Sequence, residues 1–261
     1  MRPRLPSVDP FSASFGVFLG TWAALVVAWQ VPSLLAVVAG LGVLVALVTW
    51  VGVEQVPAFV DGALVHRLHL VVAGLAALPL VASLLLVERT AVARSSPVLL
   101  LAFAVAIAGF AAVVTGTSRR ARVFRDRERV HLTLSAVEPR RRRAALTLVT
   151  MLAVYAVLGV VAGDLLSLWS VVGLVSGVSV GTLVVGRQRV DLVALDSGLL
   201  VRPGRQFGTS FVPWSQVVRI TVDGDTLRLH RGLPWPLVYR VDLDDCPDRE
   251  ATVSTLRARV A

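Results

Sequence analysis

The sequence predicts a multi-pass α-helical membrane protein that carries a small β-rich domain near its C-terminus. Hydrophobic residues make up 56% of the 261 residues, and charged residues only 16%, whereas soluble domains have about 25% charged residues. Six apolar segments have the length of a membrane-spanning helix. From residue 190 onward the apolar segments shorten to strand length. These few charged residues cannot cover a soluble surface of this size. Much of the chain is therefore expected to face lipid.

The first two spans lie in one long apolar stretch. No charged residue occurs between Asp9 and Glu54, and a single helix of that length would be about twice as long as the ~30 Å hydrocarbon core. Pro32 lacks a backbone N–H and disfavours helix in the residue before it, so the chain is expected to fold back there. We therefore predict spans at about residues 11–30 and 33–53.

Four further segments of similar length follow. Only helices and closed barrels satisfy the backbone in lipid, and these segments lack the period-2 alternation of barrel strands, so we expect helices. The six spans together define a membrane domain over residues 1–186. The four later spans are expected at about residues 68–87, 97–117, 144–162 and 165–185.

The distribution of arginine predicts the orientation. All 26 basic residues are arginine, and the loop at residues 118–143 holds ten of them against three carboxylates. Basic loops stay on the cytoplasmic side. Alternation through six spans then places both chain termini in the cytoplasm of a protein embedded in the cell membrane.

The same arginine loop is a candidate interaction surface. The simpler interpretation is a solvated topogenic loop that also meets anionic lipid headgroups. Docking of an acidic partner or of nucleic acid is the alternative, and nucleic acid is not favoured because the charge is confined to one loop. The candidate residues are Arg140, Arg141, Arg142 and Arg143.

Small residues recur at helical spacing on two expected spans, at Gly16 and Gly20 and again at Gly173, Gly177 and Gly181. Glycines with this spacing let helices approach closely. Packing within one bundle is the simpler interpretation, and contact between copies of the chain is the alternative.

The segment at residues 187–261 is expected to form the β-rich domain and to fold alone or nearly so. Asp223 and Gly224 form a hairpin signal, and an apolar stripe after Pro247 predicts a terminal helix. Short apolar segments separated by turn signals predict strands. These strands are expected at about residues 191–196, 199–202, 207–212, 216–222, 226–230 and 237–243.

Two stretches of this tail resemble the pleckstrin-homology-like (PH-like) domains of prokaryotic membrane proteins. Residues 195–201 (LDSGLLV) are similar to their opening hairpin, with Gly198 in the turn. Residues 211–217 (FVPWSQV) are similar to their Pro-Trp-Ser turn, with Pro213 and Trp214. The arginine run before a helical hairpin also looks like that family. The resemblance implies a half-open antiparallel barrel closed by one helix, and Trp214, which follows a proline at a strand entry, is expected to be largely buried.

Catalytic and metal-binding signals are weak. Cys246 is the single cysteine, which excludes a multi-cysteine metal site. Residues 177–181 match G-x-S-x-G, but they lie inside an expected span without the preceding strand that a nucleophile elbow needs. His66 and His69 have a spacing that could bind a metal, although polar residues where a helix meets water are the simpler interpretation. No catalytic residue, metal or cofactor is predicted.

These features predict a non-enzymatic membrane protein whose PH-like domain contacts a protein partner, another copy of itself or the lipid surface. From residue 190 the tail has nine arginines and nine carboxylates, a balance that argues against tight headgroup capture and favours protein contact. Any lipid contact is expected at Arg202 and Arg205, which flank a strand-connecting turn. The alternative is a small transporter or channel with a regulatory tail, which would need polar side chains along a path through the bundle.

Overall fold

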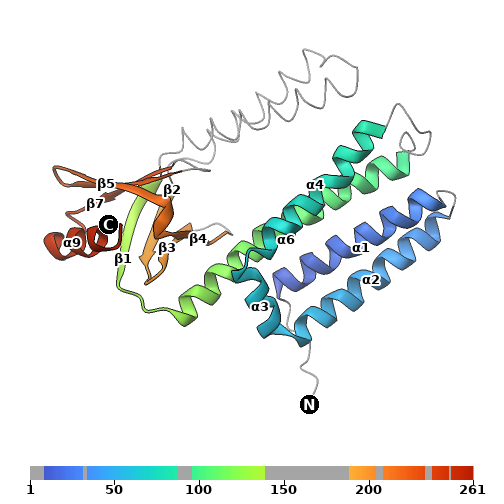
Figure 1. Ribbon diagram of the computed structural model, residues 1–261, viewed down its shortest axis with the longest axis horizontal. Helices are drawn as coiled ribbons and strands as arrows, with labels where there is room; N and C mark the ends of the chain where they lie inside the picture. Colours follow the sequence, from blue (N-terminus) through green and yellow to red (C-terminus); the bar gives the residue numbers. More distant parts are fainter. Residues whose placement is uncertain are drawn as a thin grey trace, which may run out of the picture. The chain divides into compact units, whose positions relative to one another are not determined.

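The structure is a computed structural model that describes residues 9–31, 34–86, 96–138, 188–203, 208–232, 237–246 and 248–260. The expected spans at residues 144–162 and 165–185 lie outside these ranges. The chain divides into two compact units, Met1–Arg120 and Ala121–Ala261 (Figure 1).

The first unit is helical. Among its described residues, three helices are long and apolar enough to cross a membrane, and a bent helix pair would make a fourth span. The helical state of the first four expected spans is thus confirmed. The helices are α1 (Pro10–Gln30), α2 (Leu35–Gln55), α3 (Pro57–Val65), α4 (Leu68–Leu86) and α6 (Ser96–Arg127), which continues into the second unit.

Two helix boundaries differ from the expectation. The expected loop before the third span contains α3, which Pro57 begins at a position where a missing backbone N–H costs nothing. Helix α3 meets α4 at an angle of 81°. Helix α6 continues ten residues beyond 117, to Arg127, because arginine has a high helix propensity and its charge is favourable near a helix C-terminus.

Helices α1 and α2 pack as an antiparallel hairpin through small residues (Figure 1). A Cβ atom added at Gly16 would lie 2.6 Å from the carbonyl oxygen of Ala46, and one at Gly20 would lie 2.4 Å from that of Gly42. The two backbones are therefore in direct contact, and these two glycines serve packing within the bundle.

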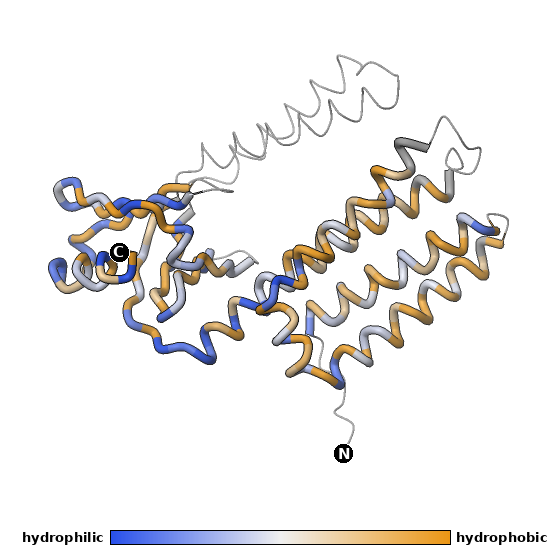
Figure 2. Tube along the Cα trace, in the orientation of Figure 1, coloured by the Kyte–Doolittle hydropathy of each residue, from blue (hydrophilic) through white to orange (hydrophobic). Residues whose placement is uncertain are grey.

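Buried residues of α1, α2, α4 and α6 form the helical core. Phe18 and Ala28 are fully buried and pack with Val72 of α4 and Val105 of α6. Large apolar side chains point outward elsewhere, for example Phe110 of α6, which is 71% exposed. Figure 2 shows that the helices of this unit are apolar along most of their length, and exposed apolar side chains are what a surface that faces lipid requires.

Replacing Gly20 with Val is expected to lower the stability of the helical unit by about 2–3 kcal/mol, the upper part of the range for overpacking. The new Cβ would meet the Gly42 carbonyl oxygen at 2.4 Å, so the two backbones must separate. The measurement is thermal unfolding of the detergent-solubilised chain. The control is Gly40→Val, because a Cβ at Gly40 meets no atom within 4 Å. Equal unfolding midpoints for the two variants would contradict the close packing.

The second unit is a seven-stranded antiparallel sheet in the order β4-β3-β2-β1-β7-β6-β5, curled into a half-barrel. The six strands and the terminal helix expected in the tail are confirmed. The strands are β1 (Leu132–Glu138), β2 (Gln188–Ala194), β3 (Gly198–Pro203), β4 (Ser210–Pro213), β5 (Val217–Asp223), β6 (Thr226–Arg231) and β7 (Val238–Asp242). A 3-10 turn, η1 (Trp214–Gln216), joins β4 to β5, and α9 (Arg249–Val260) is the C-terminal helix.

Strand β1 corrects the expected domain boundary. It lies within the expected arginine loop, yet it occupies the middle of the sheet between β2 and β7. Leu134 and Ala136 of β1 are buried in the core. Its pairing with β2 ends at Glu138 and Gln188, so residues 139–187 are inserted between two paired strand ends. The domain therefore needs residues that precede the expected fifth span.

The core of the half-barrel lies between the sheet and α9, where Leu192, Leu229 and Leu256 are fully buried or nearly so. Strand β3 is buried on both faces. Leu199 faces this core, and Leu200 packs in a second cluster with Ala121 at the end of α6. Covering on both faces explains why β3 has a continuous apolar run rather than alternation.

Candidate functional site

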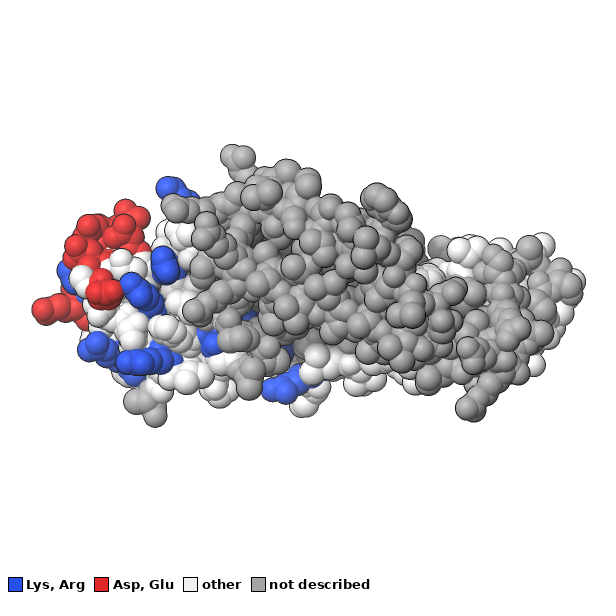
Figure 3. All heavy atoms as spheres, turned by 90° about the horizontal axis from the view of Figure 1, so that it is seen from above, with Lys and Arg blue, Asp and Glu red and all other residues white. Residues whose placement is uncertain are grey.

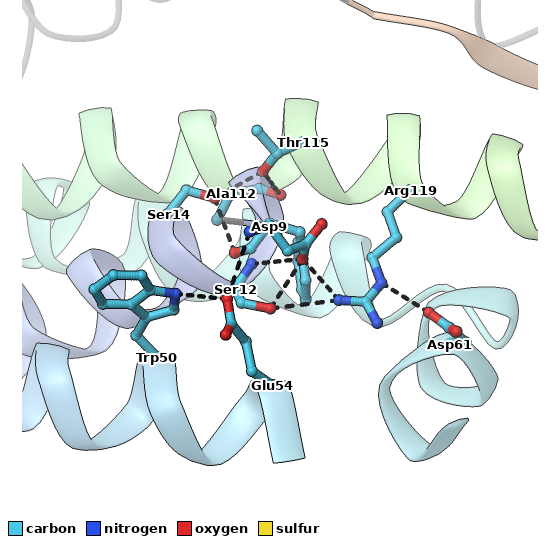
Figure 4. A network of polar contacts seen from close by, with 10 residues as sticks. Asp9, Ser12, Ser14, Trp50, Glu54, Asp61, Ala112, Thr115 and Arg119 are labelled. Carbon is cyan, nitrogen blue, oxygen red and sulfur yellow. Dashed lines mark hydrogen bonds and ion pairs between the residues drawn. The ribbon is translucent and has the colours of Figure 1, made fainter. Parts of the chain in front are cut away.

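A network of charged and polar side chains gathers the helix ends of the first unit (Figure 4). Arg119 of α6 donates from Nη1 to Asp9 Oδ2 at 2.7 Å and from Nε to Asp61 Oδ1 at 2.7 Å. The Arg119 guanidinium also lies 5.8 Å from the ring centroid of Phe11. We call Asp9, Asp61 and Arg119 the charge clamp. It joins the start of α1, the short helix α3 and the last part of α6.

Asp9 has a second role as the N-cap of α1. Its Oδ2 atom accepts hydrogen bonds from the backbone N–H of Ser12 at 3.0 Å and from the Ser12 hydroxyl at 2.9 Å. Burial acts to raise the pKa of the Asp9 carboxyl, but the Ser12 hydrogen bonds and the Arg119 charge outweigh it and hold that pKa below its ordinary value. The stabilisation by ionised Asp9 is therefore present above the ordinary carboxyl pKa and is lost as pH falls through the lowered one.

Helix α2 joins the same network through Glu54. Its Oε1 atom accepts hydrogen bonds from Trp50 Nε1 at 2.8 Å and from the backbone N–H of Asp9 at 3.4 Å. Deeper in the unit, the hydroxyls of Ser14 and Thr115 share a hydrogen bond of 2.7 Å. The network thus joins α1, α2, α3 and α6 to one another at one end of the helical unit.

The charge clamp is not apparent from the sequence. Asp9 borders a long apolar stretch, and Arg119 is one of ten arginines in the expected loop at residues 118–143. A local signal existed in Asp9, which precedes Pro10 and an apolar run in the pattern of a helix N-cap. No local pattern indicates that Arg119 pairs with Asp9, because the two residues are 110 positions apart.

The expected interaction residues are only partly within the described ranges. Arg202 is exposed near the end of β3 and is paired in register with Asp191. Arg205 and the run from Arg140 to Arg143 lie outside the residues that the structure describes.

The expected structural residues surround the β2–β3 turn. Gly198 pairs with Pro213, and a Cβ at Gly198 would lie 2.4 Å from the Val212 carbonyl oxygen, so only glycine fits there. Trp214 is half-buried rather than largely buried. Its ring packs against the core, while its Nε1 donates to the Leu195 carbonyl at 3.1 Å near the surface.

The β2–β3 turn is also held by charge. His131 Nε2 lies 2.6 Å from Asp196 Oδ1, and Arg259 of α9 donates to the carbonyl of Leu195 at 2.9 Å. The hydrogen bond from His131 is the main cause that lowers the pKa of Asp196, with smaller contributions from the backbone of Arg129 and from nearby positive charge. These contacts link the α6–β1 connection and α9 to one turn.

Charge is distributed unevenly over the half-barrel (Figure 3). Exposed carboxylates gather where the β5–β6 turn meets the connection from β7 to α9, two loops joined by a hydrogen bond from Leu243 N–H to the Asp225 carbonyl. Burial and then the charges of Asp245 and Asp242 raise the pKa of the Cys246 thiol, which indicates a negative local field. We call Asp223, Asp225, Asp242, Asp244 and Asp245 the acidic corner.

Arginines form a row across the outer face of the sheet. Val137 of β1 pairs with Arg189 of β2 on one side and with Arg240 of β7 on the other. Arg240 in turn pairs with Arg228 of β6. Arg189 and Arg240 are exposed. We call Arg189, Arg228 and Arg240 the arginine row. Arg189 lies beside the strand ends that lead into residues 139–187. The acidic corner lies toward the opposite strand ends, where Arg228 forms an ion pair with Asp223.

The two edges of the sheet are poorly suited to pairing with another strand. Edge strand β4 has only four residues and ends in Pro213. Edge strand β5 contains an irregularity in register between Val217 and Arg219. Short, proline-ended and irregular edge strands oppose strand addition. Contacts of this domain therefore depend on its faces and corners.

The candidate metal ligands are not brought together. His66 caps α3 with Nδ1 at 2.8 Å from the Gly62 carbonyl, whereas His69 is buried. Asp61 and Glu54 belong to the polar network described above. Within the described ranges no group of three or more His, Cys, Asp or Glu side chains is arranged to hold a metal ion.

Comparisons with protein families, with curated proteins and with solved structures found no match to this chain. The arrangement itself defines a coarse class. The described part of the chain has three or four helices apolar enough to span a membrane and a curled antiparallel half-barrel with a C-terminal helix.

Proposed function

We propose that this chain is a non-enzymatic integral membrane protein with six spans, and that its cytoplasmic PH-like domain binds a basic protein partner through the acidic corner. The observation that carries this proposal is the gathering of five exposed carboxylates in the acidic corner, at the strand ends opposite the paired residues Glu138 and Gln188.

The pairing of β1 with β2 supports an orientation for the domain. Residues 139–187 contain the two spans expected at 144–162 and 165–185, and they leave and re-enter the sheet at the paired residues Glu138 and Gln188. Those strand ends must then lie close to the membrane. The adjacent Arg189 would face the anionic cytoplasmic leaflet, where an arginine adds about 1 kcal/mol of attraction.

The same orientation directs the acidic corner away from the bilayer. Anionic lipid would repel it, so its occupant is a positively charged surface in the cytoplasm. Asp223 and Asp225 form ion pairs with Arg228 and Arg249. Asp244 and Asp245 are exposed beside them, so the corner retains net negative charge and complementary charge would steer a basic partner to it.

Cross-linking in membranes tests this proposal. A photoreactive residue in place of Glu250, exposed in the first turn of α9, is expected to form a protein adduct that is lost in high salt and in Asp244→Asn/Asp245→Asn. The control Asp126→Asn/Asp191→Asn removes equal charge elsewhere and should keep the adduct. An adduct with a second copy of the chain would identify its basic segment as the partner. An adduct that is insensitive to the corner variant, or no protein adduct, would exclude the proposal.

A further inference from the structure

A second group of basic residues lies at the sharp bend between α3 and α4. Arg67 stands in this bend, His69 is in the first turn of α4, and Arg120 follows the charge clamp on α6. The positive charges of Arg67 and Arg120 both act on His69, and the charge of Arg67 acts on Arg120. The three groups therefore lie close enough for their charges to influence one another.

His69 carries the strongest sign that this group takes a ligand. The residue is 7% exposed, and its Nδ1 atom is buried without a hydrogen-bond partner among the described residues. A buried polar atom without a partner is unfavourable. Helix α4 begins at Leu68, directly beside His69, and the start of a helix favours anions.

The backbone of Arg67 provides an independent observation. Its φ angle is +69°, in the left-handed region that is unfavourable for a residue with a Cβ and that glycine adopts freely. The bend alone would be formed more easily by glycine. Strain that persists at one residue points to a role for its side chain, and here that side chain brings a positive charge to His69.

We propose that Arg67, His69 and Arg120, together with the N-terminus of α4, bind a phosphate group at the end of the helical unit. Guanidinium groups bind phosphate through paired charge-assisted hydrogen bonds, and the His69 ring supplies a further donor. The two nearby carboxylates of the charge clamp are bonded to Arg119. The phosphate belongs either to a phospholipid headgroup, which lies at this depth beside spanning helices, or to a soluble anion.

The full-length chain tests the proposal in two arms. The first compares thermal unfolding in nanodiscs of phosphatidylcholine with nanodiscs in which one third is phosphatidylglycerol. The second titrates the detergent-solubilised chain with inorganic phosphate against sodium chloride at equal ionic strength. Stabilisation in the first arm alone identifies a lipid headgroup, and stabilisation by inorganic phosphate identifies a soluble anion. Both outcomes support a phosphate site.

Arg67→Gly is the decisive variant because it relieves the backbone strain. It should fold at least as well as the parent chain, yet its apparent affinity for the phosphate-bearing probe should fall roughly tenfold, as loss of one charge-assisted contact implies. Arg67→Lys should keep part of the affinity, and the exposed Arg125→Gln on α6 should keep all of it. Equal affinity in the parent and Arg67→Gly, or an equal loss in Arg125→Gln, would overturn the proposal.

Discussion

A fragment of residues 188–261 alone will not fold cooperatively. It retains six of the seven strands and α9, but it lacks β1, which lies between β2 and β7. Without β1 the backbone groups of both neighbours lose their partners, and the core loses Leu134 and Ala136. Unpaired strands in the middle of a small sheet leave too little buried surface to offset chain entropy. Far-ultraviolet circular dichroism during heating measures the outcome.

The matched control restores β1 in one short chain. Residues 121–138 joined through an Asn-Gly turn to residues 188–261 should melt in a single sharp transition, because Glu138 and Gln188 are directly paired and a two-residue turn closes an antiparallel pair. The same fragment with the β1 residues in scrambled order should behave like 188–261. If the tail alone melts as sharply as the linked fragment, β1 is dispensable and the corrected domain boundary is wrong.

Arg119→Met will lower the stability of the helical unit by about 3–5 kcal/mol, the range for removing one partner of a buried ion pair. Only 12% of the Arg119 side chain is exposed, and its loss leaves the carboxylates of Asp9 and Asp61 without their cation. The contact with the Phe11 ring is lost as well. Equilibrium unfolding in mixed micelles provides the measurement.

Two further variants distinguish the loss of the charge clamp from a general effect of removing an arginine from α6. Arg125→Met removes an exposed arginine from the same helix and should change stability by less than about 0.5 kcal/mol. Adding Asp61→Asn to Arg119→Met should cost less than the two single changes together, because the carboxylate left unpaired is removed. Strictly additive losses, or a loss in Arg125→Met as large as in Arg119→Met, would show that the ion pairs do not stabilise the unit.

Local patterns in the sequence were sufficient for most elements. Apolar segments of spanning length became α1, α2, α4 and α6 over the described residues, because the length of a lipid-facing helix is a local property. The strands of the tail could equally be predicted from local patterns. The hairpin expected at Asp223-Gly224 is present, with Gly224 at a φ of +57°. Gly198 and Pro213 were identified as structural residues, and the structure pairs them.

The sequence by itself thus determined helices of membrane-spanning length and a β-rich tail, since helix length, alternation and turn chemistry act over a few residues. The tertiary structure decided that Leu132–Glu138 is the middle strand of the sheet and that Arg119 bonds Asp9 and Asp61. In both cases the partners are far apart in the chain. By local pattern alone, several other arginines could have paired with Asp9 and Asp61, and several other alternating segments could have formed the middle strand. Tertiary packing selects one of these chemically equivalent partners, because only one of them has the right geometry and burial.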